Sequence, residues 1–66
     1  SMKRQNTRAL DRQIEAIVST RCAGLPIDIM EIGNVFQAGY NAAFNGQDVE
    51  VAVVEMYRKL SAEVQP

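Results

Sequence analysis

The chain has 66 residues, of which 47% are hydrophobic and 23% charged, and its formal net charge at pH 7 is −1. This balance argues against a general nucleic-acid coat, which is normally clearly basic, and no apolar run approaches the roughly 18 residues of a membrane span. The single cysteine and the lack of histidine exclude an internal disulfide and a His/Cys zinc cluster.

In so small a chain a single core supplies only about 3–5 kcal/mol, so further stability usually comes from a disulfide framework, a metal or a partner. We expect homo-oligomerisation to supply it here. Ser1 before Met2 has the form of a tag-removal scar, and residues 1–6 are expected to be disordered, with one helical domain over residues 7–64. No apolar signal-peptide segment follows Met2, so a cytoplasmic location is expected.

The first helical pattern covers about Thr7 to Arg21. Its apolar stripe consists of Leu10, Ile14, Ile17 and Val18. Three arginines at intervals of four form a basic ridge beside this stripe: Arg4, Arg8 and Arg12. The ridge is either a solvated face, with Arg8–Asp11 and Arg12–Glu15 pairs along the helix, or a surface that binds an anion.

The end of this helix carries a different arginine. Arg21 follows the apolar stripe, so it either has its stem packed and its charge in water at the helix C-terminus, or points into an interface or pocket where it binds phosphate. Gly24 and Pro26 are expected to end the helix, with Gly24 at the left-handed C′ position. Cys22 lacks a histidine partner and is interpreted as a small buried hydrophobe.

The stretch Ile32–Gln47 contains no charged residue. Asp28 and Glu31 have the spacing of a capping box, which predicts a second helix from Asp28 to about Phe44. Its apolar face is predicted to comprise Ile29, Ile32, Phe36, Tyr40 and Ala43. The opposite face carries amides and alanines: Asn34, Asn41 and Asn45, with Ala38 and Ala42 between them. Solvated helix faces usually carry charges, so we expect a partner or ligand to cover this face.

Gly33 and Gly39 flank the apolar face, and each costs up to about 1 kcal/mol in a helix relative to alanine. Their presence favours close packing of another helix. A third helix is expected from Val49 to about Glu63, capped by Asp48. Its main stripe is Val49, Val53, Met56, Leu60 and Val64, with Val51 and Val54 on a second apolar face. The β-branched run 49–54 also allows a strand.

Enzymatic chemistry is not expected, because the chain lacks a histidine base and any GxGxxG, P-loop or metal-ligand spacing. No metal or cofactor is expected either. Asp28 and Asp48 are explained as caps, and the other carboxylates as solvated surface. Seven residues could combine in a nucleotide pocket between subunits, the arginines holding phosphate and the others base and sugar: Arg8, Arg12, Arg21, Tyr40, Asn41, Phe44 and Asn45.

With its arginine-rich leading helix and the segment FQAGYNAAFNG, the chain resembles very small phage-encoded helical proteins that inhibit bacterial defence, including oligomeric sponges for nucleotide immune signals. The resemblance implies a non-enzymatic trap for a partner or ligand in the cytoplasm of a bacterial host.

We therefore expect an all-α chain of three short helices that forms a homo-oligomer through the second and third helices. It would sequester a small phosphorylated ligand, such as a nucleotide signal. A second hypothesis is a protein-interaction module that docks on a host or regulatory protein through the uncharged face. The third is a small DNA-binding regulator that uses residues 3–12, although the acidic balance and the lack of a helix-turn-helix signature argue against it.

Overall fold

The computed structural model describes residues 6–65. These residues form three α-helices and one 3₁₀ helix: α1 (Arg8–Arg21), η1 (Ile29–Glu31), α2 (Ile32–Phe44) and α3 (Val49–Val64). The all-α prediction is confirmed, and the strand alternative for residues 49–54 is wrong. Of the segment expected to be disordered, residues 1–5 lie outside the described residues, and the Asn6 side chain accepts a hydrogen bond from the Arg8 backbone at 3.0 Å.

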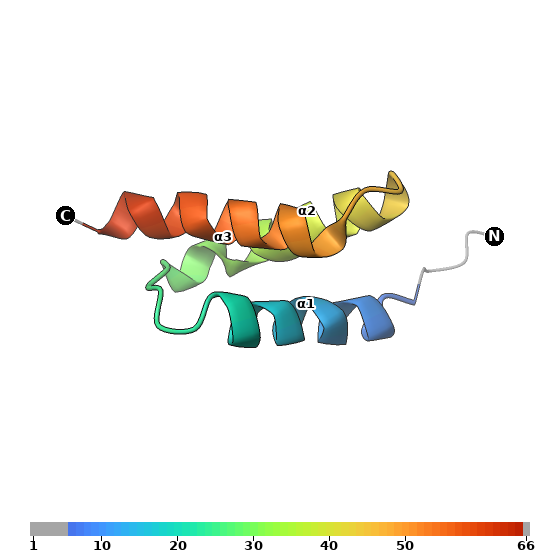
Figure 1. The fold of residues 1–66 in the computed structure, drawn as a ribbon, viewed down its shortest axis with the longest axis horizontal. Helices are drawn as coiled ribbons and strands as arrows, with labels where there is room; N and C mark the ends of the chain where they lie inside the picture. Colours follow the sequence, from blue (N-terminus) through green and yellow to red (C-terminus); the bar gives the residue numbers. More distant parts are fainter. Residues whose placement is uncertain (1–5, 66) are drawn as a thin grey trace.

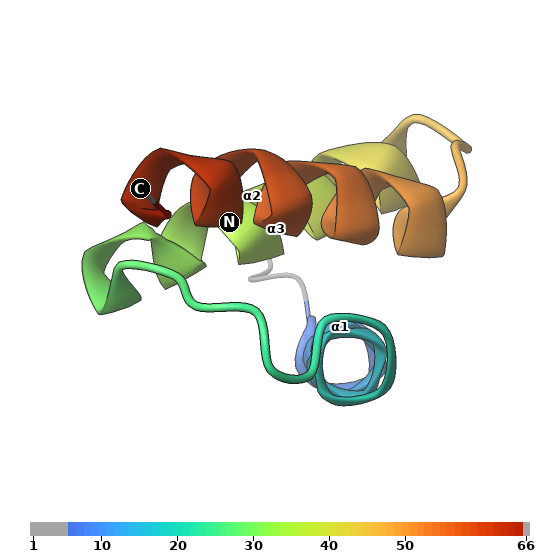
Figure 2. The ribbon, with the colours of Figure 1, turned by 60° about the vertical axis from the view of Figure 1, so that its left-hand side comes forward.

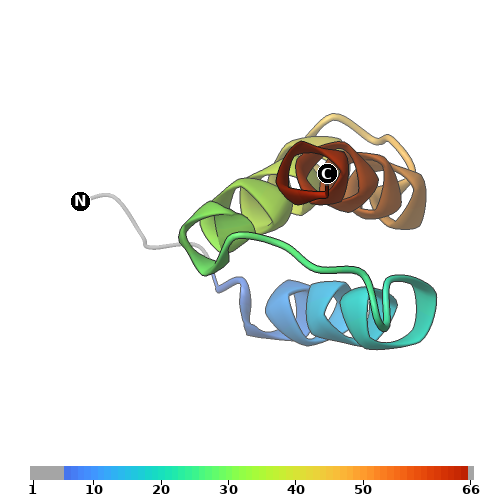
Figure 3. The ribbon, with the colours of Figure 1, turned by 90° about the vertical axis from the view of Figure 1, so that its left-hand side faces the viewer.

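The helices form two layers. Figure 1 shows α2 and α3 side by side and antiparallel, with α1 beneath them. In Figure 2 the view runs along α1 while α3 extends across it, so α1 crosses the α2–α3 pair at a steep angle. Figure 3 shows the same layers from the end of the pair where α3 finishes. In the part of the chain described, no helix is both long and apolar enough to cross a bilayer.

Helix α1 follows its predicted pattern. Ile14 and Ile17 are buried, and Leu10 and Val18 pack against them from the edge of the core. Cys22 is the C-terminal cap, and its backbone N–H donates to the Val18 carbonyl at 3.0 Å. The prediction of a buried cysteine is confirmed, since Cys22 is 1% exposed.

Gly24 has a left-handed backbone with φ of 83°. The left-handed conformation of Gly24 was predicted correctly, but Gly24 was expected to be the first residue after the helix cap. Gly24 is instead the second residue after Cys22, where it turns the chain toward η1.

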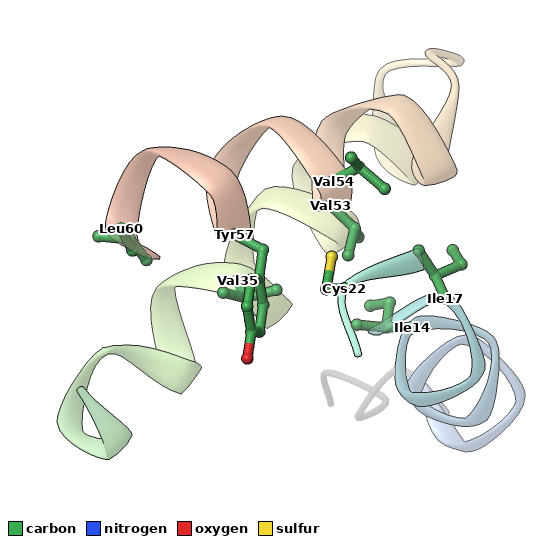
Figure 4. Close-up of a cluster of buried hydrophobic side chains, with 8 residues drawn as sticks. All are labelled: Ile14, Ile17, Cys22, Val35, Val53, Val54, Tyr57 and Leu60. Atoms are coloured by element: carbon green, nitrogen blue, oxygen red, sulfur yellow. The ribbon is translucent and has the colours of Figure 1, made fainter. Parts of the chain in front are cut away.

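The core lies between the two layers and draws on all three helices (Figure 4). Its buried members are Ile14, Ile17, Cys22, Val35, Val53, Val54, Tyr57 and Leu60. The Tyr57 hydroxyl donates to the Leu25 carbonyl at 2.8 Å. This bond holds the loop between α1 and η1 against α3, so the one polar atom of the tyrosine ring is satisfied.

The prediction of which face of α2 is buried was only partly correct, because Ile32, Phe36 and Tyr40 pack against the edge of the core while its centre is another face. Val35, Gly39 and Ala42 face the core, roughly a quarter turn from the face expected from hydrophobicity. Ala42, expected between the exposed asparagines, is 2% exposed. The predicted core residues are partly buried at the edge (Ile32, Phe36, Tyr40) or exposed (Ile29, Ala43).

The reason for this rotation is Gly39. A Cβ atom at that position would lie 2.5 Å from Ile14 Cδ1 and 3.2 Å from Val53 Cγ2, so α1 and α3 both approach α2 where it has no side chain. The predicted close packing at Gly39 is therefore confirmed. At Gly33 it is wrong within this chain, because an added Cβ would meet no atom within 4 Å. Ile29 leaves the predicted face because it belongs to the 3₁₀ turn, which winds more tightly than an α-helix.

Both predicted aspartate caps are present. Asp28 accepts from the Met30 backbone N–H and Asp48 from that of Val51, each at 3.0 Å. The capping box is only half formed, because the Glu31 carboxylate accepts from the Asn34 side chain at 3.1 Å.

Helix α3 buries a broader face than predicted because it contacts both other helices. Val53 and Leu60 were predicted correctly, whereas Val54 is buried and was expected on a second face. Val51 is 51% exposed, and Val64 at the helix end is 45% exposed rather than part of the core stripe.

Candidate functional site

A groove between α2 and α3 has a volume of about 380 Å³, against about 180 Å³ for each of two other hollows on the described surface. We call it the α2–α3 groove. No residue of α1 lines it, and Leu60 is the one lining residue that belongs to the buried core cluster. Each helix contributes residues at i, i+3, i+4 and i+7, and Glu31 adds one end. The lining is Glu31, Asn34, Gln37, Ala38, Asn41, Met56, Lys59, Leu60 and Glu63.

Of the three asparagines predicted to face a partner, Asn34 and Asn41 line this groove and Asn45 does not. The Gln37 side-chain amide donates to the Asn41 side-chain oxygen at 3.0 Å, which orders both residues along the rim. The Gln37 carbonyl oxygen and the Asn41 amino group keep further bonding capacity. The charged lining consists of one cation, Lys59, and two carboxylates, Glu31 and Glu63, so its net charge is −1. A phosphate in this groove would meet net repulsion.

Arg21 lies elsewhere, at the junction of α1 and the start of α3. Its guanidinium forms an ion pair with Glu50, and the two side chains are 52% and 47% exposed. They line a hollow of about 180 Å³ that also includes Asp48 and Glu55. This setting favours the interpretation of Arg21 as a cation at a helix C-terminus with its charge in water, and within one chain the carboxylates disfavour a phosphate beside it.

Tyr40 connects α2 to α1. Its hydroxyl donates to one oxygen of Asp11, and the Thr7 hydroxyl donates to the other at 3.3 Å. Asp11 was expected to be a solvated carboxylate, but it is partly buried. The Tyr40 bond ties its carboxylate to α2, and the Thr7 bond holds it at the start of α1. Tyr40 therefore serves the fold in a single chain, and its hydroxyl is already engaged.

The other predicted site residues are on the surface. Arg8, Arg12, Asn41, Phe44 and Asn45 are all exposed, with the Phe44 side chain at 60%. The predicted helix pairs of Arg8 with Asp11 and Arg12 with Glu15 are not formed among the described residues. The structure joins Tyr40 to Asp11 and places Asn41 in the groove, but brings no predicted arginine to a predicted amide or aromatic residue within the three hollows.

The sequence interpretation missed a third hollow of about 180 Å³ at the end of α3, lined by Leu25, Arg58, Ser61, Ala62 and Gln65. Ser61 is 3% exposed, and among the described residues its hydroxyl has no hydrogen-bond partner. Its burial follows from the wide core-facing side of α3. The helical period alone signals this burial, because Ser61 lies four residues after Tyr57 and directly after Leu60.

The stability of the fold is expected to change at alkaline pH because of two weakly acidic side chains, Tyr40 and Cys22. The pKa of the Tyr40 hydroxyl is raised, first by its bond to Asp11 and then by burial. Burial also raises the pKa of the Cys22 thiol, partly opposed by Arg58 and Arg21. Folding thus favours the protonated form of both groups. Their contribution to the free energy of unfolding is complete at pH values below the pKa values that these groups have in the unfolded chain. It is lost as the pH rises through their pKa values in the folded chain.

We therefore expect the free energy of unfolding to fall as the pH rises above about 9. Urea unfolding followed by circular dichroism from neutral pH to about pH 11 measures this. The variant carrying Tyr40→Phe and Cys22→Ala should lose much of the slope while remaining folded at neutral pH. An equal slope in this variant and the wild type would contradict the assignment.

Comparison with known proteins gives no relative: no protein-family model, curated protein or solved structure matches the chain. Within residues 6–65, no group of three or more potential ligands could hold a metal ion. The site chemistry must therefore be argued from the geometry alone.

Proposed function

We propose that the protein is a non-enzymatic binding protein that acts as a homo-oligomer and sequesters a small phosphorylated ligand, such as a nucleotide signal, at a boundary between subunits. The observation that carries the proposal is the diversion of Asp11. This carboxylate lies three residues after Arg8, where it would normally neutralise the arginine, but it is bonded to Tyr40 and Thr7.

Arg8 is consequently displayed on α1 without an ion pair in the described part of the chain. Arg12 forms none with Glu15 either, since the one ion pair among the described residues joins Arg21 and Glu50. Arg8 and Arg12 are four residues apart, and side chains at this spacing emerge about 5–6 Å from each other on one helix face. Two guanidinium groups so placed can contact the same phosphate through charge-assisted hydrogen bonds. A lone solvated arginine provides neither the charge density nor the geometry.

The rest of the ligand would be held by a neighbouring subunit. Phe44 offers an exposed ring for stacking, and Asn45 beside it offers an amide donor and acceptor for a base or sugar. In a single chain, neither these two residues nor Arg8 and Arg12 line any of the three hollows described above. A second subunit that presents its α2 end to α1 would complete the pocket.

Isothermal titration with cyclic and ADP-ribose-type nucleotides tests the proposal. We expect heat of binding from at least one nucleotide. The double change Arg8→Gln and Arg12→Gln should weaken binding by at least about tenfold, because each charge-assisted hydrogen bond contributes about 1.5–3 kcal/mol.

The matched control is Arg58→Gln, which removes an arginine from α3 at the third hollow. Its affinity should equal that of the wild type. Flat titrations with every nucleotide, or equal losses in the control and the double variant, would contradict the proposed site.

A second candidate function is a protein-interaction module that uses the α2–α3 groove. The observation in its favour is the lining of neutral amides and apolar side chains with a net charge of −1, which suits a protein surface better than a phosphate. A stoichiometric protein partner retained in a pull-down, with flat nucleotide titrations, would favour this function.

A further inference from the structure

The α2–α3 groove contains the groups of a self-complementary surface. In a two-fold symmetric dimer the same patch faces itself, so every contact occurs twice and each donor or charge needs its counterpart within the patch. The groove has a cation, Lys59, and carboxylates one helical turn away at Glu63 and across the groove at Glu31. It also has free amide donors and acceptors at Gln37 and Asn41. These are the counterparts that a second copy requires.

We propose that the α2–α3 groove binds the same groove of a second copy of this chain, with the two α3 helices antiparallel. In this arrangement the two-fold axis passes near residue 61 of α3, since that pairing brings Lys59 of each copy beside Glu63 of the other. Leu60 then lies near the axis, and the two ion pairs flank it. The inference rests on the homo-oligomer of the proposed function, but this interface is distinct from the contact between α1 and the end of α2 that the proposed ligand pocket needs.

Apolar side chains at one end of the groove support this occupant. Ile29 and Met30 are 73% and 84% exposed, and they directly precede Glu31 of the groove lining. Val64, 45% exposed, directly follows Glu63. Figure 1 shows η1 and the end of α3 at the same end of the molecule. A copy with its axis near residue 61 would cover this end, where exposed apolar area is otherwise unfavourable.

The groove also permits close approach. Ala38 provides a small side chain on α2. Together with Met56 and Leu60 it forms the apolar floor of the groove, between rims of amides and charges. Two such grooves facing each other give a four-helix arrangement, in which α2 and α3 of each copy bury their second faces.

Sedimentation velocity across the micromolar range, without added ligand, tests the dimer. We expect the wild type to sediment as a dimer. Lys59→Glu should give a folded monomer, because every charged side chain of the groove is then negative. Adding Glu63→Lys to that variant exchanges the charges and should restore the dimer.

The control is Arg58→Glu, which makes the same change in charge one residue away but lines the third hollow. It should remain dimeric, and circular dichroism checks that each variant is folded. A monomeric wild type, an oligomer insensitive to Lys59→Glu, or a charge exchange that fails to restore the dimer would overturn the inference. A dimer that meets these expectations but binds no nucleotide would refute the proposed ligand and leave this interface standing.

Discussion

Replacing Ile14 with alanine is expected to leave most of the protein unfolded at room temperature. The Ile14 side chain is fully buried where α1 meets the other two helices (Figure 4). Truncating such a side chain costs about 2–5 kcal/mol, because the lost contacts are compounded by the cavity left behind. A core of this size supplies only about 3–5 kcal/mol in total, so one truncation removes most or all of it.

Far-UV circular dichroism and urea unfolding measure this loss. The matched control is Val51→Ala, which also shortens an apolar side chain but at a position that is 51% exposed. Its free energy of unfolding should stay within about 0.5 kcal/mol of the wild type. If both variants unfolded at the same urea concentration, Ile14 could not be a central contact of the core.

The features that the sequence predicted well are those set by neighbouring residues. Asp28 and Asp48 bond to backbone groups two and three residues away, and the left-handed Gly24 relieves a local steric constraint. The α1 stripe was also correct, because one face of this helix meets the rest of the protein. Such interactions depend on spacing alone, so periodicity and residue type suffice to find them.

The features that the sequence did not predict depend on contacts between distant segments. The bond from Tyr40 to Asp11 spans 29 residues, and that from Tyr57 to Leu25 spans 32. Neither partner has a local signal for the other. The same holds for the candidate site. The exposure of Arg8 and Arg12 follows from their spacing, but the lack of an Arg8–Asp11 ion pair follows from the packing of Tyr40 on α2 against Asp11.

The buried face of α2 shows a second limit of periodicity. A hydrophobic pattern gives weight to large side chains, so it selected Phe36 and Tyr40 as the core face. The actual contact with α1 and α3 is centred on Gly39, where the missing side chain lets Ile14 enter. Glycine adds no hydrophobicity to the pattern. The space that it leaves for Ile14 is found only when the positions of the neighbouring helices are known.

Gly39→Ala is accordingly expected to destabilise the protein by about 1–2 kcal/mol, with overpacking costing about 1–3 kcal/mol and helix propensity returning up to about 1 kcal/mol. The new Cβ would lie 2.5 and 2.8 Å from Ile14 Cδ1 and Cγ1 and 3.2 Å from Val53 Cγ2. Ile14 and Val53 are both fully buried, so neither side chain can swing into solvent to make room.

The same substitution at Gly33 should have the opposite sign. With nothing within 4 Å of its Cβ position, Gly33→Ala gains helix propensity without a clash and should stabilise by up to about 1 kcal/mol. Urea midpoints of the two variants compare one chemical change at two positions of one helix. Equal shifts in the same direction would contradict the close approach of α1 at Gly39.

Ile14→Val identifies the clashing side chain. It removes Cδ1, the atom nearest to the new Cβ, and by itself should cost only about 0.5–1.5 kcal/mol, so the variant remains folded. If Ile14 causes the overpacking, Gly39→Ala must cost less in the Ile14→Val background than in the wild type, with a coupling energy of at least about 0.5 kcal/mol. Additive costs would mean that α2 meets α1 through other residues, and the steep crossing that places Ile14 over Gly39 would have to be abandoned.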